Sequence, residues 1–230
     1  MSLDPKYSDL LLTPKDIAKR IAKEIPDGST VNLGIGIPTL VANYVDPLKG
    51  ILFMAENGIL GTGPKPKKGE EDLNYINASR EPVIPIKGAS IFDHAEAFSM
   101  IRGGHIDIAI LGALQVSENG DLSNWTVPGE ARGGIGGAMD LAKGVKEVYA
   151  VMKHITKDGM LKFLKKCSYP LTAKKVVTKI FTDMALIEIT EKGPILKEMA
   201  TGLNQELIEK FSEPKLIIPS KTSFILKEEE

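Results

Sequence analysis

The run from Ile106 to Leu111, "IDIAIL", is the sequence feature that most constrains the fold. All of its residues except Asp107 are apolar, and half of them are β-branched isoleucines. A strand with one wet face alternates apolar and polar residues, whereas a strand buried on both faces reads as a nearly continuous apolar run. Helices bury both faces of a sheet when they join parallel strands. The run therefore predicts an α/β fold.

The rest of the chain alternates helix patterns with strand patterns. Thr13 can cap a helix that starts at Pro14, and Ile17, Ile21 and Ile25 recur at helical spacing. Other helices are expected from Pro38, from Asp93, from Ala138 and over 204–211. Strands are expected over 29–33, 51–55, 106–111, 145–152 and 179–189, the last as a strand or a strand pair.

No linker, internal repeat or low-complexity segment interrupts this pattern. We expect one domain over residues 1–230, with 1–12 and 225–230 as frayed tails. The polar stretch 61–80 is rich in Gly, Pro, Lys and Glu, and we expect a long surface loop there, either a solvated loop or a lid.

Charge and cysteine content argue against several classes of protein. The 230 residues carry 29 basic and 30 acidic side chains, which gives no electrostatic reason to bind nucleic acid or an anionic membrane. The only cysteine is Cys167, so no disulfide forms within the chain, as fits a reducing compartment. The first residues lack a signal-peptide pattern, and no apolar run approaches the roughly 18 residues of a membrane span. We expect a cytoplasmic protein.

Polar or glycine-rich segments follow several predicted strands, where the ligands of open α/β sheets gather. They are Asn32 to Gly36, Glu56-Asn57-Gly58, and Gly112. A further glycine cluster, 133–137, precedes the helix expected at Ala138. Backbone amides at such a junction can bind an oxyanion or a phosphate.

These glycines do not form a known nucleotide motif. Thr39 stands where the dinucleotide fingerprint that starts at Gly34 needs its third glycine, and Met139 does so for the cluster at Gly134. No Gly-x-x-x-x-Gly-Lys-Ser/Thr sequence is present. Nicotinamide and ATP chemistry are therefore not expected.

The sequence also supports neither a metal site nor a cysteine or serine nucleophile. His94, His105 and His154 are scattered, with no spacing that builds a metal site. Cys167 has no catalytic motif around it and is interpreted as structural, and a Gly-x-Ser-x-Gly elbow is absent. Glu56 remains, a single carboxylate after an apolar run. A carboxylate can attack an activated acyl group as a covalent nucleophile, but on these residues alone a Glu-Asn-Gly segment is more often an ordinary turn.

Six segments are informative when taken together. They are "VNLGIGIPTLVANYV" (31–45), "ENGILGTG" (56–63), "IRGGHIDIAILGALQV" (101–116), "GDLSNWTVPG" (120–129), "GGIGGAMDLAKG" (133–144) and "KKCSYPLTA" (165–173). In this order they resemble the β subunit of a family I coenzyme A transferase, and the resemblance runs from about Thr13 to Pro219.

The resemblance implies a three-layer α/β/α open, mainly parallel sheet of the kind shared with ribose- and glucosamine-phosphate isomerases. It implies a ping-pong transfer of coenzyme A between carboxylic acids, of the short-chain acyl or 3-keto acid kind, through a glutamyl-CoA thioester on Glu56. No cofactor is implied, because the coenzyme A thioester is itself a substrate. The amides of Gly136 and Gly137 become candidates for the oxyanion hole.

The resemblance also implies that further residues bind the substrate or coenzyme A near Glu56. Asn32 is expected either to orient the carboxylate or to cap the adjacent turn. The remaining candidates, which come from the two strand ends, are Gly34, Gly36, Ile37, Pro38, Asn57 and Gly58.

Two positions depart from the family pattern. Glu130 stands where a basic residue is usual, and His94 replaces what is commonly a small hydroxyl residue. The family's α half is not found in the sequence, so we expect an α-subunit partner, an α2β2 assembly, and no activity from the isolated chain.

Two other functions stay open at this point. A sugar-phosphate isomerase or phosphate sensor would use the glycine turns for phosphate and Glu56 as a base. A non-catalytic partner subunit would only complete another chain's site.

Overall fold

The computed structural model describes residues 3–130, 134–225 and 227. Its main feature is a ten-stranded sheet in the order β13-β12-β11-β10-β8-β5-β1-β2-β3-β4. The strands are β1 (Thr30–Leu33), β2 (Leu52–Ala55), β3 (Ile59–Thr62), β4 (Pro85–Ile91), β5 (Ile108–Gly112), β8 (Glu147–Val151), β10 (Val177–Phe181), β11 (Ala185–Thr190), β12 (Gly193–Ala200) and β13 (Ser223–Ile225). A small second sheet has the order β7-β6-β9, from β6 (Gln115–Ser117), β7 (Leu122–Ser123) and β9 (Phe163–Leu164).

The five neighbouring strands β2, β1, β5, β8 and β10 run parallel, and the antiparallel pairs of this sheet lie toward its two edges. Val31 on β1 pairs with Phe53 on β2 and with Ile108 on β5. The apolar run around β5 is buried, as its composition predicts. The expected α/β fold with a mainly parallel sheet is confirmed.

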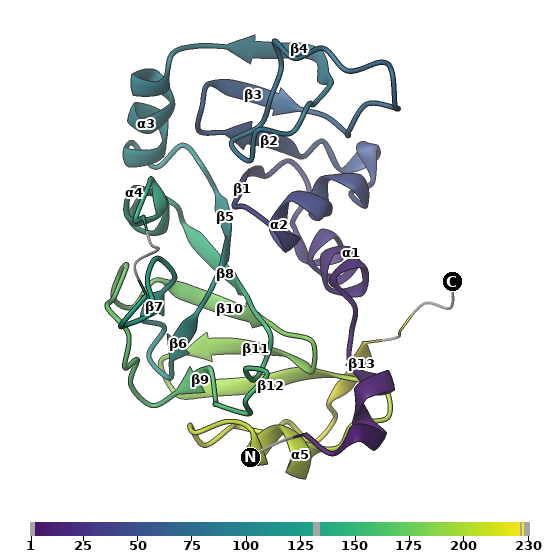
Figure 1. The fold of residues 1–230 in the computed structure, drawn as a ribbon, viewed down its shortest axis with the longest axis vertical. Helices are drawn as coiled ribbons and strands as arrows, with labels where there is room; N and C mark the ends of the chain where they lie inside the picture. The colour runs from purple at the N-terminus through teal and green to yellow at the C-terminus, as the bar shows by residue number, and fades with distance from the viewer. Residues whose placement is uncertain (1–2, 131–133, 226, 228–230) are drawn as a thin grey trace.

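Helices cover both faces of this parallel core. In Figure 1, α1 (Pro14–Glu24) and α2 (Ile37–Leu40) lie on one side of β1, β5 and β8, while α3 (His94–Arg102) and α4 (Ala138–Gly144) lie on the other. The structure thus has the three layers that the resemblance implied. The other helices are α5 (Gln205–Lys210) and the 3-10 segments η1 (Pro5–Leu10), η2 (Val41–Asn43) and η3 (Pro47–Lys49).

The sequence explains where α1 begins and which face it buries. The Thr13 hydroxyl accepts from the backbone amide of Asp16, and the Asp16 carboxylate accepts from that of Thr13, which forms a capping box. Ile17 and Ile21 are buried in the core. Within the described residues, no helix combines the length and the apolar character needed to cross a bilayer.

The strand order reverses around β1. The chain passes from β1 to β2 on one side, continues to β3 and β4, and returns through α3 to β5 on the other side of β1. The connection that follows β1 therefore leads to one side of β1, and the connection that follows β5 leads to β8 on the other side. A crevice at such a point is where open α/β sheets bind ligands.

The loop expected over 61–80 was wrong at its start, because β3 occupies Ile59–Thr62. Strand β4 was not predicted, because its mostly exposed residues show no regular alternation of buried and exposed positions. The helix expected from Pro38 to about Tyr44 is present in two parts, the α-helical turn α2 and the 3-10 turn η2.

The described parts of the two ends are structured rather than frayed, because apolar residues are buried there. Leu12 and Ile225 are both buried. The Leu12 amide donates to the Asp183 carbonyl at 2.8 Å, and β13 pairs in parallel with β12. One domain over 1–230 stays a prediction. The main sheet is consistent with it, because its strands come from both ends of the chain.

A polar cluster is buried beyond the end of β8. His154 is completely buried; its Nδ1 lies 3.0 Å from Thr182 Oγ1 and its Nε2 lies 3.1 Å from Ser212 Oγ. Burial, with a smaller effect of the Lys162 charge, lowers the pKa of His154 from 6.5 to about 4. The residue is therefore a neutral, structural histidine.

Candidate active site

Glu56 follows the last residue of β2, and Asn32 holds its carboxylate. Asn32 lies on β1 beside Met54 and is completely buried. Its Nδ2 donates to Glu56 Oε2 at 3.0 Å and to the Met54 carbonyl at 3.1 Å. Both neighbours can only accept, so the amide must present its nitrogen to them. Of the two roles predicted for Asn32, these contacts are those of a residue that orients the carboxylate.

The turn after Glu56 requires glycine. Gly58 has φ +116°, and a Cβ there would overlap the carbonyl oxygen of Phe92. The Gly58 amide donates to the Ala55 carbonyl at 2.9 Å, which turns the chain back into β3. The Asn57 side chain is exposed and donates to the Ile76 carbonyl at 2.7 Å. Asn57 thus attaches the following loop to the turn.

Glu56 lines a cavity of about 480 Å³ at the carboxyl ends of β1, β2, β5 and β8. The start of α4 closes one side of it. The predicted site residues that the cavity brings together are Gly34, Ile37, Pro38, Glu56, Gly136 and Gly137. The other predicted site residues, Gly36, Asn57, Gly58 and Asn32, do not line the cavity. Asn32 is connected to it through its hydrogen bond to Glu56.

Asn124 also lines this cavity, and sequence reasoning missed it. Its Oδ1 accepts from the Thr172 hydroxyl at 2.6 Å, which fixes the side chain. Asn124 lies just after the two-residue strand β7, which is too short for a periodic pattern. The only signal for it was its place inside the segment "GDLSNWTVPG".

Gly136 and Gly137 precede α4, and packing explains the second of them. A Cβ on Gly137 would lie 2.6 Å from Cζ of Phe98, whose ring packs beneath this glycine. The Leu141 amide donates to the Gly137 carbonyl at 3.0 Å and begins the helix. Gly133, the first glycine of the predicted cluster, lies outside the described residues.

The two departures from the family pattern have different surroundings. His94 is the first residue of α3, and its Nδ1 lies 3.1 Å from the backbone carbonyl oxygen of Glu56. Glu130 is exposed, and its amide donates to the Val127 carbonyl at 3.1 Å. Any effect of Glu130 on acid preference stays a prediction.

The other candidates from the sequence lie elsewhere. Cys167 is half-buried, its Sγ lies 3.6 Å from the Asp121 carbonyl, and burial raises the pKa of its thiol, which disfavours a nucleophilic thiolate. Among the residues that the structure describes, no cluster of three His, Cys, Asp or Glu side chains could hold a metal ion.

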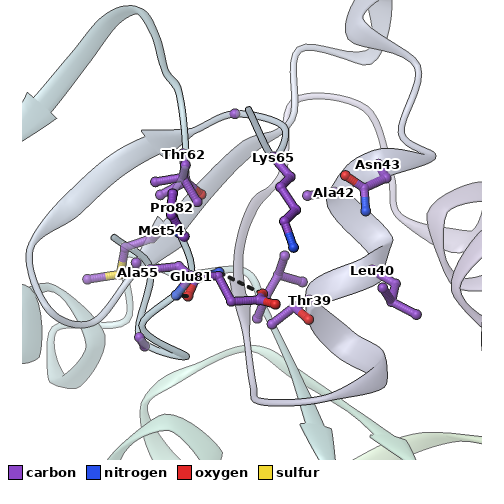
Figure 2. A pocket seen from close by; sticks show the side chains of 15 residues that line it. Thr39, Leu40, Ala42, Asn43, Met54, Ala55, Thr62, Lys65, Glu81 and Pro82 are labelled. Atoms are coloured by element: carbon purple, nitrogen blue, oxygen red, sulfur yellow. Dashed lines mark hydrogen bonds between the residues drawn. The ribbon is translucent and has the colours of Figure 1, made fainter. Parts of the chain in front are cut away.

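A second, smaller cavity of about 100 Å³ lies under the loop that follows β3 (Figure 2). Lys65 extends toward Thr39 and Glu81 in this view, and Met54 and Ala55 form part of the wall. Glu56 does not line this cavity, so the acid after β2 belongs to the larger one.

Fold and site together define an open α/β protein that holds an oriented carboxylate, beside a glycine-rich helix start, where the strand order reverses. Residues 15–208 match the family described as coenzyme A transferase. The chain belongs to the coenzyme A transferase family, as the resemblance predicted.

Two relatives of similar length illustrate the membership. The chain is 49% identical over 197 residues to the B subunit of a probable succinyl-CoA:3-ketoacid coenzyme A transferase of Bacillus subtilis, covering 85% of this chain and 91% of that protein. It is 46% identical over 207 residues to the B subunit of a 3-oxoadipate CoA-transferase of Pseudomonas putida, covering 90% and 97%.

A solved structure shows the same fold. The acyl-CoA transferase apoenzyme of Escherichia coli O157:H7 superposes with a TM-score of 0.74 at 19% identity. The match covers 97% of this chain but 44% of that one, so the present chain spans less than half of the longer polypeptide.

Proposed function

We propose that this chain is the β, or B, subunit of a CoA-transferase in which Glu56 is the covalent nucleophile. The observation that carries the proposal is the Glu56 carboxylate, held by the buried Asn32 amide at the wall of a 480 Å³ cavity. The proposed substrates are short-chain acyl or 3-keto acids and their coenzyme A thioesters. The names of the relatives support these classes.

The reaction needs no redox step and no net proton transfer. A Glu56 carboxylate oxygen attacks the thioester carbonyl carbon, the C–S bond breaks, and the coenzyme A thiolate leaves with the electron pair. The thiolate then attacks the Glu56 carbonyl carbon of the mixed anhydride, which forms a glutamyl-CoA thioester and frees the donor acid. The acceptor carboxylate reverses both steps and carries coenzyme A away. The thioester is a substrate, and no other cofactor is part of this scheme.

The tetrahedral intermediates of these steps carry an oxyanion, and the proposal assigns its stabilisation to the amides of Gly136 and Gly137. Both glycines line the cavity that Glu56 lines. Amides that are already fixed beside the reacting carbonyl stabilise the negative charge that develops on its oxygen in the transition state. Removal of one such donor typically costs about a hundredfold to a thousandfold in rate. Gly34, Ile37 and Pro38 would form the opposite wall around the acyl group and the pantetheine arm.

The proposal includes an α-subunit partner in an α2β2 assembly. Two observations support a partner. Both relatives above are named as B subunits, and the Escherichia coli chain is more than twice as long as the part of it that matches. A site shared between two subunits would leave the isolated chain inactive.

A reconstituted assay tests the proposal. The chain is co-expressed with an α subunit, and the exchange of coenzyme A is followed from succinyl-CoA or acetyl-CoA to acetoacetate, 3-oxoadipate or butyrate. Wild type should show parallel lines in a two-substrate plot, the kinetic sign of a ping-pong route. Glu56→Gln, which keeps the size of the side chain and removes its charge, should reduce exchange to background.

The same assay separates the other two functions. A Glu56→Gln complex that keeps activity within about tenfold of wild type would leave this chain as a non-catalytic partner. An isomerase would instead interconvert sugar phosphates, and would show no exchange of coenzyme A with any acid.

A further inference from the structure

His94 connects the Glu56 backbone to the glycine-rich start of α4. It begins α3, where the Asp93 carboxylate caps the helix by accepting from the Glu96 amide at 2.8 Å. Its Nδ1 lies 3.1 Å from the Glu56 carbonyl oxygen. Because a carbonyl oxygen can only accept, Nδ1 must carry a proton and donate to it.

The other side of the His94 ring rests on Phe98. The ring centroids lie 4.6 Å apart at an interplanar angle of 55°, within the range of favourable aromatic contacts. Phe98 is buried and lies directly beneath Gly137, where even a methyl group would not fit. A continuous contact therefore runs from the Glu56 carbonyl through two rings to Gly137.

The helix that carries both rings is itself fixed to α4. The Arg102 guanidinium donates to Asp140 at 2.8 Å and lies 5.5 Å from the centroid of the Phe98 ring. Phe98 thus packs between His94 and Arg102 on α3, and it also lies against Gly137 at the start of α4. His94 is the exposed end of this stack, and its Nδ1 makes the contact to the nucleophile's own residue.

We propose that His94 is a positioning residue that sets the distance between the Glu56 carboxylate and the amides of Gly136 and Gly137. It acts through the backbone of Glu56, while Asn32 acts on the carboxylate. The inference rests on the proposed function, because it assigns a role in the attack of Glu56 on a thioester. A misplacement of about 1 Å in such an arrangement can cost about a hundredfold in rate.

Three variants separate the hydrogen bond from the ring contact. His94→Asn places an amide nitrogen at the position of Nδ1 but lacks the ring. His94→Phe keeps a ring on Phe98 but cannot donate, and His94→Ala removes both. Ser99→Ala is the matched control, since Ser99 is exposed on the same helix and its hydroxyl donates to the Ala95 carbonyl within that helix.

The measurement is the single-turnover rate of adduct formation on Glu56 in the complex with the α subunit, together with the acyl-CoA concentration that gives half the maximal rate. We expect His94→Ala and His94→Phe to slow the maximal rate by about tenfold to a hundredfold, with the half-saturating concentration within about threefold of wild type. His94→Asn should restore the rate to within about fivefold of wild type, and Ser99→Ala should leave it unchanged. Melting temperatures verify that each complex is folded.

Each other result overturns the inference in a distinct way. Equal maximal rates for wild type and His94→Ala would show that His94 positions nothing. A change confined to the half-saturating concentration would make His94 a substrate-binding residue. A slow His94→Asn variant beside a fast His94→Phe variant would assign the effect to the ring rather than the donor. Absence of any adduct in wild type contradicts the proposed function itself, and is recognised before the variants are compared.

Discussion

Replacement of Asn32 by aspartate tests the way this site holds its nucleophile. The two side chains have the same shape, so Asn32→Asp exchanges only a buried donor for an acceptor. In the native protein Nδ2 donates to Glu56 Oε2 at 3.0 Å and to the Met54 carbonyl at 3.1 Å. In the variant a second carboxylate faces the first at about the same separation.

Two effects set the size of the loss. A hydrogen bond to a charged group contributes about 1.5–3 kcal/mol, which corresponds to roughly tenfold to 150-fold if all of it serves the transition state. Two charges about 4 Å apart at an effective dielectric constant of about 20 repel by about 4 kcal/mol, or about three pH units of proton affinity. The pair of carboxylates therefore holds one proton well above the pH at which a single carboxylic acid ionises.

The assay is the pH dependence of kcat in the reconstituted complex. Asn32→Asp should be slower than wild type by at least about tenfold at about pH 8, where both carboxylates are ionised, and should recover toward about pH 6, where the protonated carboxyl introduced by the substitution can donate to Glu56. Asn32→Ala should be slow at both pH values. An Asn32→Asp enzyme with the wild-type rate and pH profile would refute the assignment of Asn32 as the orienting donor.

Three further predictions concern positions around the site and in the core. Gly137→Ala keeps the backbone N–H but places a methyl group 2.6 Å from Cζ of Phe98, so the amide must shift. A shift of about 1 Å should lower kcat by about a hundredfold with little change in acyl-CoA affinity, and an unchanged kcat would contradict the oxyanion assignment. Gly58→Ala places a Cβ at φ +116°, where it overlaps the Phe92 carbonyl oxygen. The free energy of unfolding should fall by about 3 kcal/mol or more, as measured by thermal unfolding, and a wild-type melting temperature would disprove the need for glycine. The folded-state pKa of His154, about 4, lies below its ordinary 6.5, so the unfolded chain binds the extra proton and stability is lost as pH falls from 6.5 toward 4, by up to about 3 kcal/mol. His154→Gln, which cannot titrate, should flatten this slope of melting temperature against pH, and an equally steep slope would assign the acid sensitivity to other groups.

The sequence predicts the elements that carry strong local signals. Thr13, Asp93 and Asn204 each cap a helix where their side chains lead one to expect it. The isoleucine-rich run forms β5, as predicted, because a strand that is buried on both faces needs apolar side chains at almost every position. Glu56 and the glycines before α4 could be selected because each follows or precedes a well-marked element.

The remaining features depend on contacts that no local pattern reveals. Strand β4 pairs with β3 at the edge of the sheet, and its exposed residues give no period of two. Leu12 and Ile225 are buried, and their backbone partners are far away in sequence, which is why the ends looked frayed. The Leu12 amide donates to the Asp183 carbonyl in the turn between β10 and β11, and Ile225 pairs with Ala200 on β12. The contact of His94 with Glu56 arises from the return of the chain through α3, and nothing near residue 94 indicates it. Its contact with Phe98 is different, because the two residues are four apart on α3 and a helix from Asp93 already places them side by side.

The intact mass of this chain, taken from the complex with its α subunit after incubation with acyl-CoA and mild borohydride, tests the central claim most directly. Borohydride reduces a glutamyl thioester to the alcohol, so the account predicts a modified peptide that contains Glu56 in wild type and no modification in Glu56→Gln. An assembled complex that gives no adduct with any of a panel of acyl-CoA donors, or an adduct on another residue, would contradict the account.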